Sequence, residues 1–405
     1  MKRIMEGIRV VEVAAWTYVP IAGAVLAEWG ADVIKIEHPE SGDPQRGLVT
    51  SGLMPSGPGS VNFMIELPNR GKRSVGLDLK NEQGRQVLLD LVKTADVFLT
   101  NFRPQARKNL RIDVDDLRAV NPRLIYVRGS GQGQRGPESE RGGYDACSYW
   151  ARGGSADIIS DPDDYPLMQP GPAYGDVIGG MTIAGGISAA LYHRERTGEA
   201  LVVDNSLLAT GMWATGASVL MAGLFGFGRF PRGNRGKAPN PLVLTYKTKD
   251  GRYLSLVMLE SDRYWADLVH KVGRSELADD PRFVDAAARA QNSEECVAIL
   301  DEIFASRTFE EWKSLLQEVK GVWAPVQTAA EVLEDPQVLE NGYLREVEAA
   351  SGTKFRMVAS PLQFDEEPAD LVRAPDHGEH TDEVLGELGL DTDAILELKI
   401  AGAVL

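Results

Sequence analysis

RVVEVAAWTYVPIAGAVLAEWGADVIKIE, residues 9–37, is the stretch that decides the fold. Residues 9–13 are apolar and β-branched, residues 21–29 have a helical pattern, and residues 32–37 contain a second run of strand-forming residues. The order strand, helix, strand is the signature of parallel α/β architecture. We therefore predict an α/β protein built on a parallel sheet.

The same alternation continues along the chain. Further strands are expected at residues 74–79, 97–99, 124–128 and 201–205, with a helix at 82–94. A segment rich in glycine, proline and arginine, residues 226–241, interrupts the pattern and predicts a linker.

Beyond this linker the pattern predicts a smaller α+β domain, with a hairpin within residues 246–258 and helices near 264–272, 292–306 and 309–319. We expect residues 1–225 to form the N-terminal part of a large domain. Residues 226–330 are expected to form a small domain together with its linkers. A C-terminal segment, residues 331–405, is expected to return to the large domain.

Composition limits the kinds of function open to the chain. Its 405 residues, 43% of them hydrophobic, suffice for a large buried core. The two cysteines have no metal-binding or redox spacing, which favours a reducing cytoplasm. The start of the chain resembles no signal peptide, and no apolar stretch has the length of a membrane span. A net charge of -16 makes nucleic acid an unfavourable partner.

A carboxylate stands among glycines in the segment Gly175-Asp176-Val177-Ile178-Gly179-Gly180. The pattern predicts a glycine-lined turn ahead of an apolar helix at residues 181–192. Asp is a common helix N-cap, so a capping role is the simplest interpretation of Asp176. Where glycines let a thioester approach closely, the same carboxylate can act as a nucleophile, and the amides near Gly179 and Gly180 are candidates for stabilising the oxyanion.

A glycine-rich motif follows the strand expected at residues 124–128. Residues 131–136 match the dinucleotide pattern G-x-G-x-x-G, but a polar loop follows them where that motif requires a helix.

Other polar stretches also bear on the chemistry. Two basic stretches, residues 69–73 and 103–111, are expected in loops at the rim of the sheet, where they would serve as phosphate sites or as solvated surface. Gly143-Tyr144-Asp145 adds a second carboxylate. The five histidines show no spacing typical of a metal site or a catalytic triad.

Taken together and in chain order, these blocks resemble the class III CoA-transferases of the CaiB/BaiF type. That family includes formyl-CoA:oxalate and carnitine CoA-transferases and α-methylacyl-CoA racemase. The matching blocks are Gly7 to Val13, Gly30 to Glu37, Asn69 to Leu79, Asn101 to Pro104, Gly143 to Asp145, Gly175-Asp176, Ala189 to Gly198 and Gly378 to Leu385. The resemblance implies a Rossmann-like large domain, a small domain, and a homodimer of two interlocked rings.

By this resemblance Asp176 is the catalytic aspartate, which accepts CoA from an acyl-CoA and passes it to a carboxylic acid through an aspartyl-CoA thioester. Coenzyme A is then a substrate, and no permanently bound cofactor is expected. Racemases of the family resemble Gly-His-Asp where this chain has Tyr144, and tyrosine is a poor base at neutral pH, which favours a transferase. A racemase or other CoA-thioester isomerase and a non-catalytic CoA-binding protein are the alternatives.

The family pattern also indicates the residues that contact CoA, with Tyr144, Asp145, Gly179 and Gly180 as support for Asp176. Four aromatic residues, Trp16, Tyr144, Tyr149 and Trp150, would suit a bulky or apolar acyl group. The implied CoA contacts are Ala15, Trp16, Thr17, His38, Lys72, Arg73, Asn101, Phe102, Arg103 and Lys108.

Overall fold

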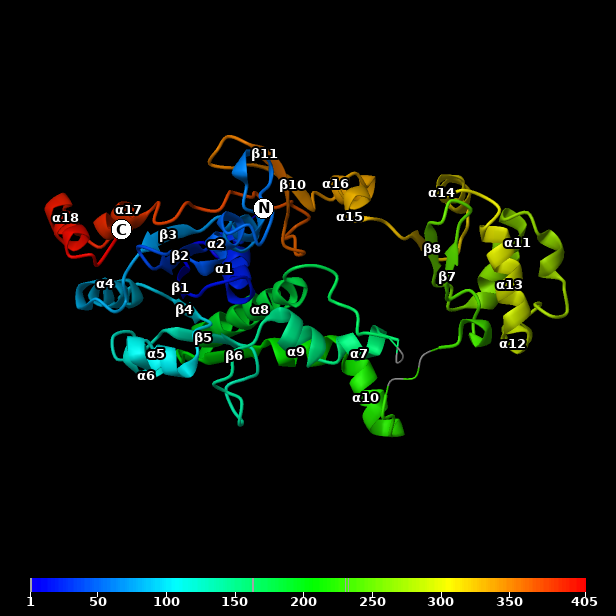
Figure 1. Ribbon diagram of the computed structural model, residues 1–405, viewed down its shortest axis with the longest axis horizontal. Helices are drawn as coiled ribbons and strands as arrows, with labels where there is room; N and C mark the ends of the chain where they lie inside the picture. Colours follow the sequence, from blue (N-terminus) through cyan, green and yellow to red (C-terminus); the bar gives the residue numbers. More distant parts are fainter. Residues whose placement is uncertain (1, 162–163, 230, 232) are drawn as a thin grey trace. The chain divides into compact units, whose positions relative to one another are not determined.

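The computed structural model describes residues 2–161, 164–229, 231 and 233–405, which form two compact units. The first unit comprises Met1–Phe230 together with Pro336–Leu405, and the second comprises Pro231–Asp335. Figure 1 shows the elements of both units. Each unit has a hydrophobic core of its own.

The first unit is built on a six-stranded sheet in the order β3-β2-β1-β4-β5-β6, and every pair of neighbours is parallel. This is the strand order of the doubly wound, Rossmann-like fold, so the expected fold class is confirmed. The strands are β1 (Arg9–Val13), β2 (Asp32–Glu37), β3 (Arg73–Gly76), β4 (Val97–Thr100), β5 (Ile125–Ser130) and β6 (Val202–Ser206).

Helices cover both faces of this sheet. Along β1, Val10 belongs to one core cluster, whereas Val11 and Val13 belong to the other. Burial on two faces explains why the strands are mostly apolar, and the charged Glu12 and Lys35 within them are buried and paired with each other. The first cluster is covered by α1 (Tyr18–Glu28) and α8 (Tyr174–Thr197), and the second by α4 (Glu82–Lys93), α17 (Thr381–Glu387) and α18 (Thr392–Ile400).

Shorter helices occupy the connections of the first unit. A π-helical turn at Ala146–Ala151 lies directly after Asp145. The short helices are α2 (Gly47–Thr50), α3 (Phe63–Asn69), α5 (Pro104–Leu110), α6 (Val114–Arg118), α7 (Ser155–Ile159), α9 (Leu207–Ala214), α10 (Gly216–Phe225) and α16 (Pro336–Glu340).

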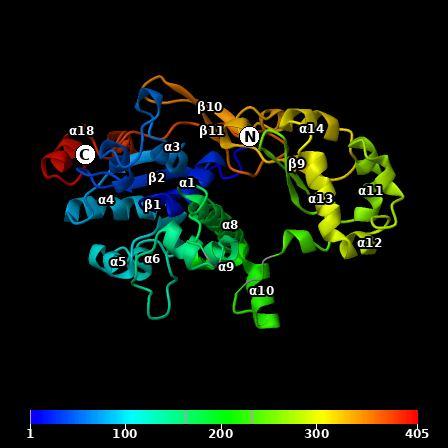
Figure 2. The ribbon, with the colours of Figure 1, turned by 45° about the vertical axis from the view of Figure 1, so that its right-hand side comes forward.

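The C-terminal segment packs against the edge of the sheet at β3. Leu405 N donates to Gly76 O over 3.2 Å, and Gly76 N donates to Thr381 Oγ1 over 3.0 Å. Figure 1 shows α17 and α18 beyond the β3 edge of the sheet. Figure 2 shows the antiparallel pair β10 (Leu344–Glu348) and β11 (Lys354–Val358), which comes earlier in the same segment. The C-terminal segment is therefore held to the β3 edge by hydrogen bonds that main-chain amides donate.

The second unit contains the hairpin expected within residues 246–258. It is formed by β7 (Thr245–Lys247) and β8 (Tyr253–Leu256), and β9 (Trp323–Pro325) adds a third antiparallel strand. A core that includes Trp265, Phe304 and Trp312 joins this sheet to its helices. The helices are α11 (Ser261–Lys271), α12 (Ala286–Gln291), α13 (Ser293–Phe304), α14 (Phe309–Leu316) and α15 (Ala329–Val332).

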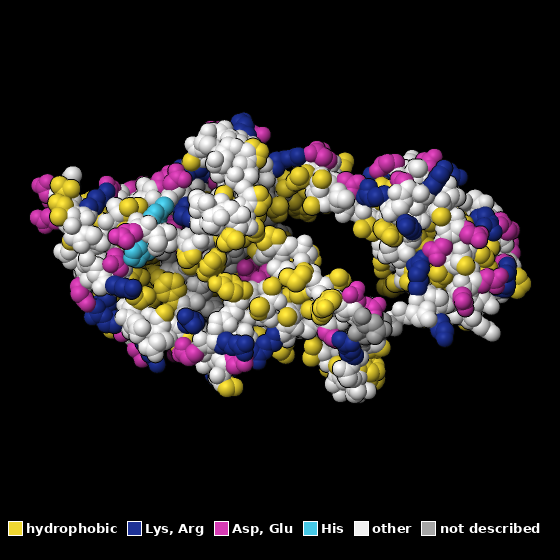
Figure 3. Space-filling model, in the orientation of Figure 1, with side chains coloured by type: hydrophobic (Ala, Val, Ile, Leu, Met, Phe, Trp, Pro, Cys, Tyr) yellow, Lys and Arg dark blue, Asp and Glu magenta, His cyan; other side chains and the backbone are white. Residues whose placement is uncertain are grey.

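Within the described residues, no single helix is long and apolar enough to cross a membrane. The helices α9 and α10 meet such a criterion only as a pair bent by 71°. Apolar side chains gather on the surface of this pair (Figure 3), including Trp213, which is 86% exposed, and Leu224 and Phe225.

Candidate functional site

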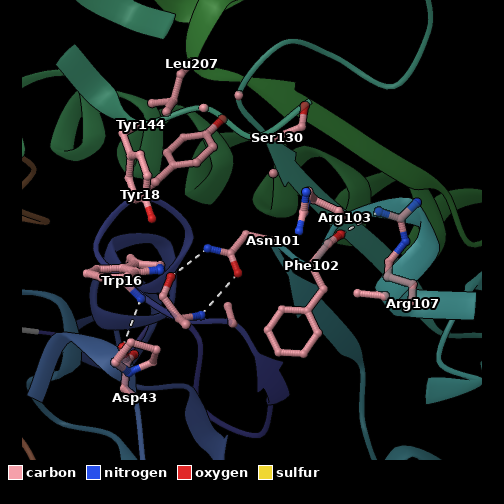
Figure 4. A pocket seen from close by; sticks show the side chains of 18 of the residues that line it. Trp16, Tyr18, Asp43, Asn101, Phe102, Arg103, Arg107, Ser130, Tyr144 and Leu207 are labelled. Atoms are coloured by element: carbon pink, nitrogen blue, oxygen red, sulfur yellow. Dashed lines mark hydrogen bonds between the residues drawn. The ribbon is translucent and has the colours of Figure 1, made fainter. Parts of the chain in front are cut away.

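A pocket of about 740 Å³ opens at the carboxyl ends of β1, β2, β4 and β5 (Figure 4). Ligands of open parallel sheets bind at this edge. The lining residues that matter for the chemistry are Ala15, Trp16, Tyr18, His38, Asp43, Asn101, Phe102, Arg103, Ser130, Arg141, Tyr144, Asp176 and Leu207.

Asp176 is the third residue of α8, which begins at Tyr174. The expectation of a glycine-lined turn ahead of a helix at residue 181 was therefore wrong, because the glycines are part of the helix. A helix N-terminus favours a carboxylate, but burial outweighs this effect and raises the pKa of Asp176 to about 7, and the charge of Asp145 adds to the rise. A carboxylate of this basicity is suited to act as a nucleophile or a base near neutral pH.

Asp145 supports the start of α8. Its two carboxylate oxygens accept hydrogen bonds of 3.1 Å from Gly175 N, and Oδ2 accepts another of 3.1 Å from Gln169 Nε2. Burial raises the pKa of Asp145, although these hydrogen bonds oppose the rise. Asp145 thus holds the first turn of the helix in place and contributes negative potential at Asp176.

The glycines at the start of α8 let neighbouring side chains approach the helix closely. A Cβ at Gly175 would lie 2.2 Å from Tyr149 Cγ, one at Gly179 2.4 Å from Tyr18 Cε2, and one at Gly180 2.4 Å from Ile21 Cγ2. The amides of Gly179 and Gly180 lie inside the helix, where they bond to carbonyls four residues earlier. Oxyanion stabilisation by these amides stays a prediction, and the observed role of both glycines is close helix packing.

Trp16 forms part of the pocket wall in a strained backbone conformation, with a φ of 67°. Its amide donates to Asp43 Oδ1 over 3.1 Å, and Asn101 exchanges two hydrogen bonds with the preceding Ala15 (Figure 4). The indole meets the ring of Tyr144 edge to face at 5.6 Å. Strain of this kind costs about 1–3 kcal/mol and is concentrated at functional sites.

Basic side chains lie at the side of the pocket formed by the loops after β2 and β4. His38 and Arg103 are exposed and line the pocket with Phe102, as expected from the sequence. Arg141 joins them from the long loop that follows β5. In a chain of net charge -16, this cluster is well suited to bind an anionic group.

Lys72 and Arg73 do not line the pocket. They stand just before and at the start of β3, at the opposite edge of the sheet from the carboxyl ends. Lys72 is buried, and its Nζ donates to Glu12 Oε2 over 2.7 Å, while Arg73 pairs with Asp32 over 2.7 Å. A residue before a parallel strand lies at the rim away from the carboxyl ends, so neither side chain lines the pocket, and their contact with CoA stays a prediction.

Four other expected contacts also lie outside the pocket. The Thr17 hydroxyl donates to Gln45 Oε1 over 2.9 Å beneath the pocket wall, and Lys108 is exposed on α5 without lining the pocket. Tyr149 and Trp150 are buried in the core rather than facing the pocket. These two aromatic side chains therefore contribute to core packing.

Sequence reasoning missed several lining residues, namely Tyr18, Ser130, Arg141 and Leu207. Ser130 ends β5 and Leu207 directly follows β6, so their position at the carboxyl edge was available from the strand pattern. Tyr18 and Arg141 carried no comparable signal. Among the residues that the structure describes, no group of three or more His, Cys, Asp or Glu could hold a metal ion.

Comparison with known proteins gives consistent matches along the chain. Residues 5–381 match the model of the family described as CoA-transferase family III. The chain is 31% identical to a (R)-2-hydroxy-4-methylpentanoate CoA-transferase of Clostridioides difficile, with 98% of each chain covered. It is 30% identical to a cinnamoyl-CoA:phenyllactate CoA-transferase of Clostridium sporogenes, covering 98% of this chain and 96% of that one.

The fold has matches among solved structures as well. A CaiB/BaiF family protein from Brucella suis superposes with a TM-score of 0.80 at 30% identity, with 96% of this chain and 100% of that chain covered.

Proposed function

Because the chain belongs to CoA-transferase family III and is an acyl-CoA:carboxylate CoA-transferase, we propose that Asp176 is its nucleophile. The observation that carries this proposal is the position of Asp176 on the wall of the pocket, at the start of α8, with its pKa raised by burial. Asp145 accepts three hydrogen bonds and is committed to holding the helix, which leaves Asp176 as the carboxylate for chemistry.

The reaction begins when a carboxylate oxygen of Asp176 attacks the thioester carbonyl carbon of the donor. The carbon–sulfur bond breaks, and a mixed anhydride and the CoA thiolate form. The thiolate then attacks the aspartyl carbonyl, which releases the donor acid and leaves an aspartyl-CoA thioester. The acceptor carboxylate attacks the aspartyl carbonyl, the carbon–sulfur bond breaks, and a second anhydride and the CoA thiolate form. The thiolate then attacks the acceptor carbonyl of this anhydride and expels the Asp176 carboxylate. The products are the new acyl-CoA and free Asp176.

Each step exchanges one activated acyl bond for another, so the thioester's free energy is retained and no ATP is needed. This conservation requires that water be kept from the anhydrides. Trp16, Tyr18, Tyr144 and Leu207 line the pocket together with Asp176 and give it apolar surface. We assign them the task of limiting the access of water to the carbonyl carbon.

The basic side of the pocket is assigned to the phosphates of CoA. His38, Arg103 and Arg141 supply positive charge or donors there, while Ala15, Trp16, Asn101 and Phe102 form the walls between this side and Asp176. Arginine suits this role because its planar guanidinium donates two parallel hydrogen bonds to a phosphate. An Arg103→Ala variant should therefore bind CoA more weakly and retain most of its kcat.

The acyl group is assigned to the aromatic part of the pocket. The names of the two relatives given above refer to (R)-2-hydroxy-4-methylpentanoate and to cinnamoyl and phenyllactate groups, each of which carries a branched aliphatic or aromatic apolar part. Trp16, Tyr18 and Tyr144 offer matching apolar surface beside Asp176. We propose a donor acyl-CoA with a branched aliphatic or aromatic acyl group.

The test is to incubate the protein with a panel of acyl-CoA donors and carboxylate acceptors, and to follow the products by chromatography. Hydroxylamine trapping and mass spectrometry should locate the acyl or CoA adduct at Asp176. Asp176→Ala should abolish transfer and labelling, whereas Asp90→Ala, at an exposed site on α4, serves as the matched control. A fully active Asp176→Ala variant refutes the proposal. Exchange of an α-proton with deuterated water in the absence of an acceptor acid would indicate an isomerase instead.

A further inference from the structure

The hydroxyl of Tyr18 is buried and lacks a hydrogen bond. Tyr18 is 6% exposed, and its Oη has no hydrogen-bond partner among the described residues. The Thr210 hydroxyl lowers the pKa of Tyr18, but its own proton is donated to Ser206 O over 2.9 Å. A buried hydroxyl without a partner costs about 1–3 kcal/mol, so its retention in a pocket points to a use.

Two glycines hold the ring of Tyr18 in place. A Cβ at Gly129, at the end of β5, would lie 3.0 Å from Tyr18 Cε1, and one at Gly179 would lie 2.4 Å from Cε2. The ring is thus held between the sheet and α8. Gly179 is three residues after Asp176, on the same face of the helix, so the ring packs one turn away from the carboxylate. The ring of Tyr18 is therefore fixed in the wall of the pocket that Asp176 also lines.

Several main-chain and side-chain groups near Asp176 are already committed to other hydrogen bonds. The Gly179 and Gly180 amides bond within α8, and the Gly175 amide donates to Asp145. Asn101 uses both its amide nitrogen and its oxygen on Ala15. Attack on a thioester carbonyl creates an oxyanion that needs a fixed donor. Tyr18 supplies a donor that is buried, uncommitted and oriented before substrate binds.

We propose that Tyr18 is a catalytic residue whose Oη donates a hydrogen bond to the carbonyl oxygen of the bound thioester as Asp176 attacks it. The inference rests on the proposed function of Asp176 and adds the donor that this function requires. The carbonyl π electrons move onto the oxygen when the new carbon–oxygen bond forms, and they return when the carbon–sulfur bond breaks. The phenol keeps its proton in both steps.

The phenol is suited to donate in this way throughout the working pH range. Burial, and next the negative charge of Asp176, raise the pKa of Tyr18 above its ordinary value. A neutral tyrosine keeps its proton and stabilises a developing negative charge without becoming an anion itself.

The test compares Tyr18→Phe with the wild-type enzyme and with Tyr192→Phe, which changes an exposed tyrosine on the same helix as Asp176. Phenylalanine keeps the ring between Gly129 and Gly179 and removes only the unpartnered hydroxyl. We expect kcat, and the single-turnover rate of adduct formation on Asp176, to fall about 100-fold, as for loss of one oxyanion donor. CoA affinity by calorimetry and KM should stay within about twofold, and the thermal midpoint should be unchanged or higher.

A purely structural role for the hydroxyl predicts the reverse pattern, with a lower thermal midpoint and no specific loss of kcat. A Tyr18→Phe enzyme whose kcat lies within twofold of the wild-type value overturns the inference while leaving Asp176 as nucleophile. Absence of an adduct in the wild-type enzyme, by contrast, refutes the proposed function itself. The two failures are therefore distinguishable in one set of measurements.

Discussion

At Asp176 two physical effects act on one carboxyl group in opposite directions. The N-terminus of α8 favours the charged form, while burial and the charge of Asp145 favour the neutral form and prevail. The proposed chemistry needs the charged form, so the reactive state of Asp176 is the one that is less favourable for folding. Two predictions at the scale of single residues follow from this balance.

The first concerns the pH dependence of transfer. Because the carboxylate is the reactive form and the pKa of Asp176 is about 7, kcat/KM should fall about tenfold per pH unit below pH 7 and level off above it. Asp145→Asn removes a negative charge and should shift this midpoint to lower pH, by less than the shift that burial causes. A profile that is flat between pH 5 and 8 would contradict the assignment.

The second concerns stability. A carboxyl group whose pKa is raised by folding destabilises the folded state when it is ionised, fully above the folded pKa of about 7 and hardly at all below pH 4. Asp176→Asn, which is neutral at every pH, should therefore be more stable than the wild-type protein at pH 8, by on the order of 2–4 kcal/mol. Denaturant unfolding at pH 8 and pH 4 measures this. If the variant gained the same stability at both pH values, an effect other than the ionisation of Asp176 would be responsible.

At the scale of elements, the packing of α1 against α8 depends on glycines that weaken α8 as an isolated helix. Interior glycine costs about 1 kcal/mol relative to alanine, yet Gly180 lets Ile21 and the backbone of Tyr18 reach the helix. The close packing of α1 against α8 stabilises the protein by more than the low helix propensity of glycine costs. This explains why the helix begins at Tyr174, seven residues earlier than the apolar pattern predicts.

Substitutions along α8 can separate packing from propensity. Gly180→Ala places a Cβ 2.4 Å from Ile21 Cγ2 and 2.9 Å from Tyr18 O, and should destabilise the protein by about 1–3 kcal/mol. Gly185→Ala, in the same helix with open space around the new Cβ, should stabilise it by about 0.5–1 kcal/mol. Chemical denaturation of the two variants tests this. A stabilised Gly180→Ala protein would show that α1 and α8 pack less closely.

At the scale of the whole molecule, the two units have separate cores, and the first unit is completed by the C-terminal segment. Phe225 and Leu224 at the end of α10 leave a large apolar surface exposed, as does Trp213 on α9. Surfaces of this kind on an isolated chain mark contacts with another protein. The family resemblance implies that the contact is with a second copy.

We therefore expect a homodimer in solution. Light scattering after gel filtration should give twice the chain mass of 44.1 kDa. Trp213→Asp, which places a charge on the most exposed aromatic side chain of α9, should shift the population toward the monomer. A wild-type mass of one chain at micromolar concentration would contradict the expectation.

The sequence predicted the local secondary-structure elements better than it predicted which residues line the pocket. The strand, helix, strand unit of residues 9–37 and the hairpin of the second unit follow from local periodicity, and both are present in the structure. Among the site residues, Trp16, Asn101, Arg103 and Asp176 line one pocket, as expected. Lys72 and Thr17 do not, although they are near neighbours in sequence of elements that form the site.

The sequence by itself determined the fold class, the family and the carboxylate on which the chemistry is proposed to depend. These rest on residue types and on periods of two or four residues, which are local properties of a chain. Only the tertiary structure decided which rim of the sheet each loop occupies, that the glycines of α8 receive Tyr18 and Ile21, and that the Tyr18 hydroxyl is left without a partner. Such facts depend on contacts between residues distant in sequence, and burial is decided only when the whole core has formed.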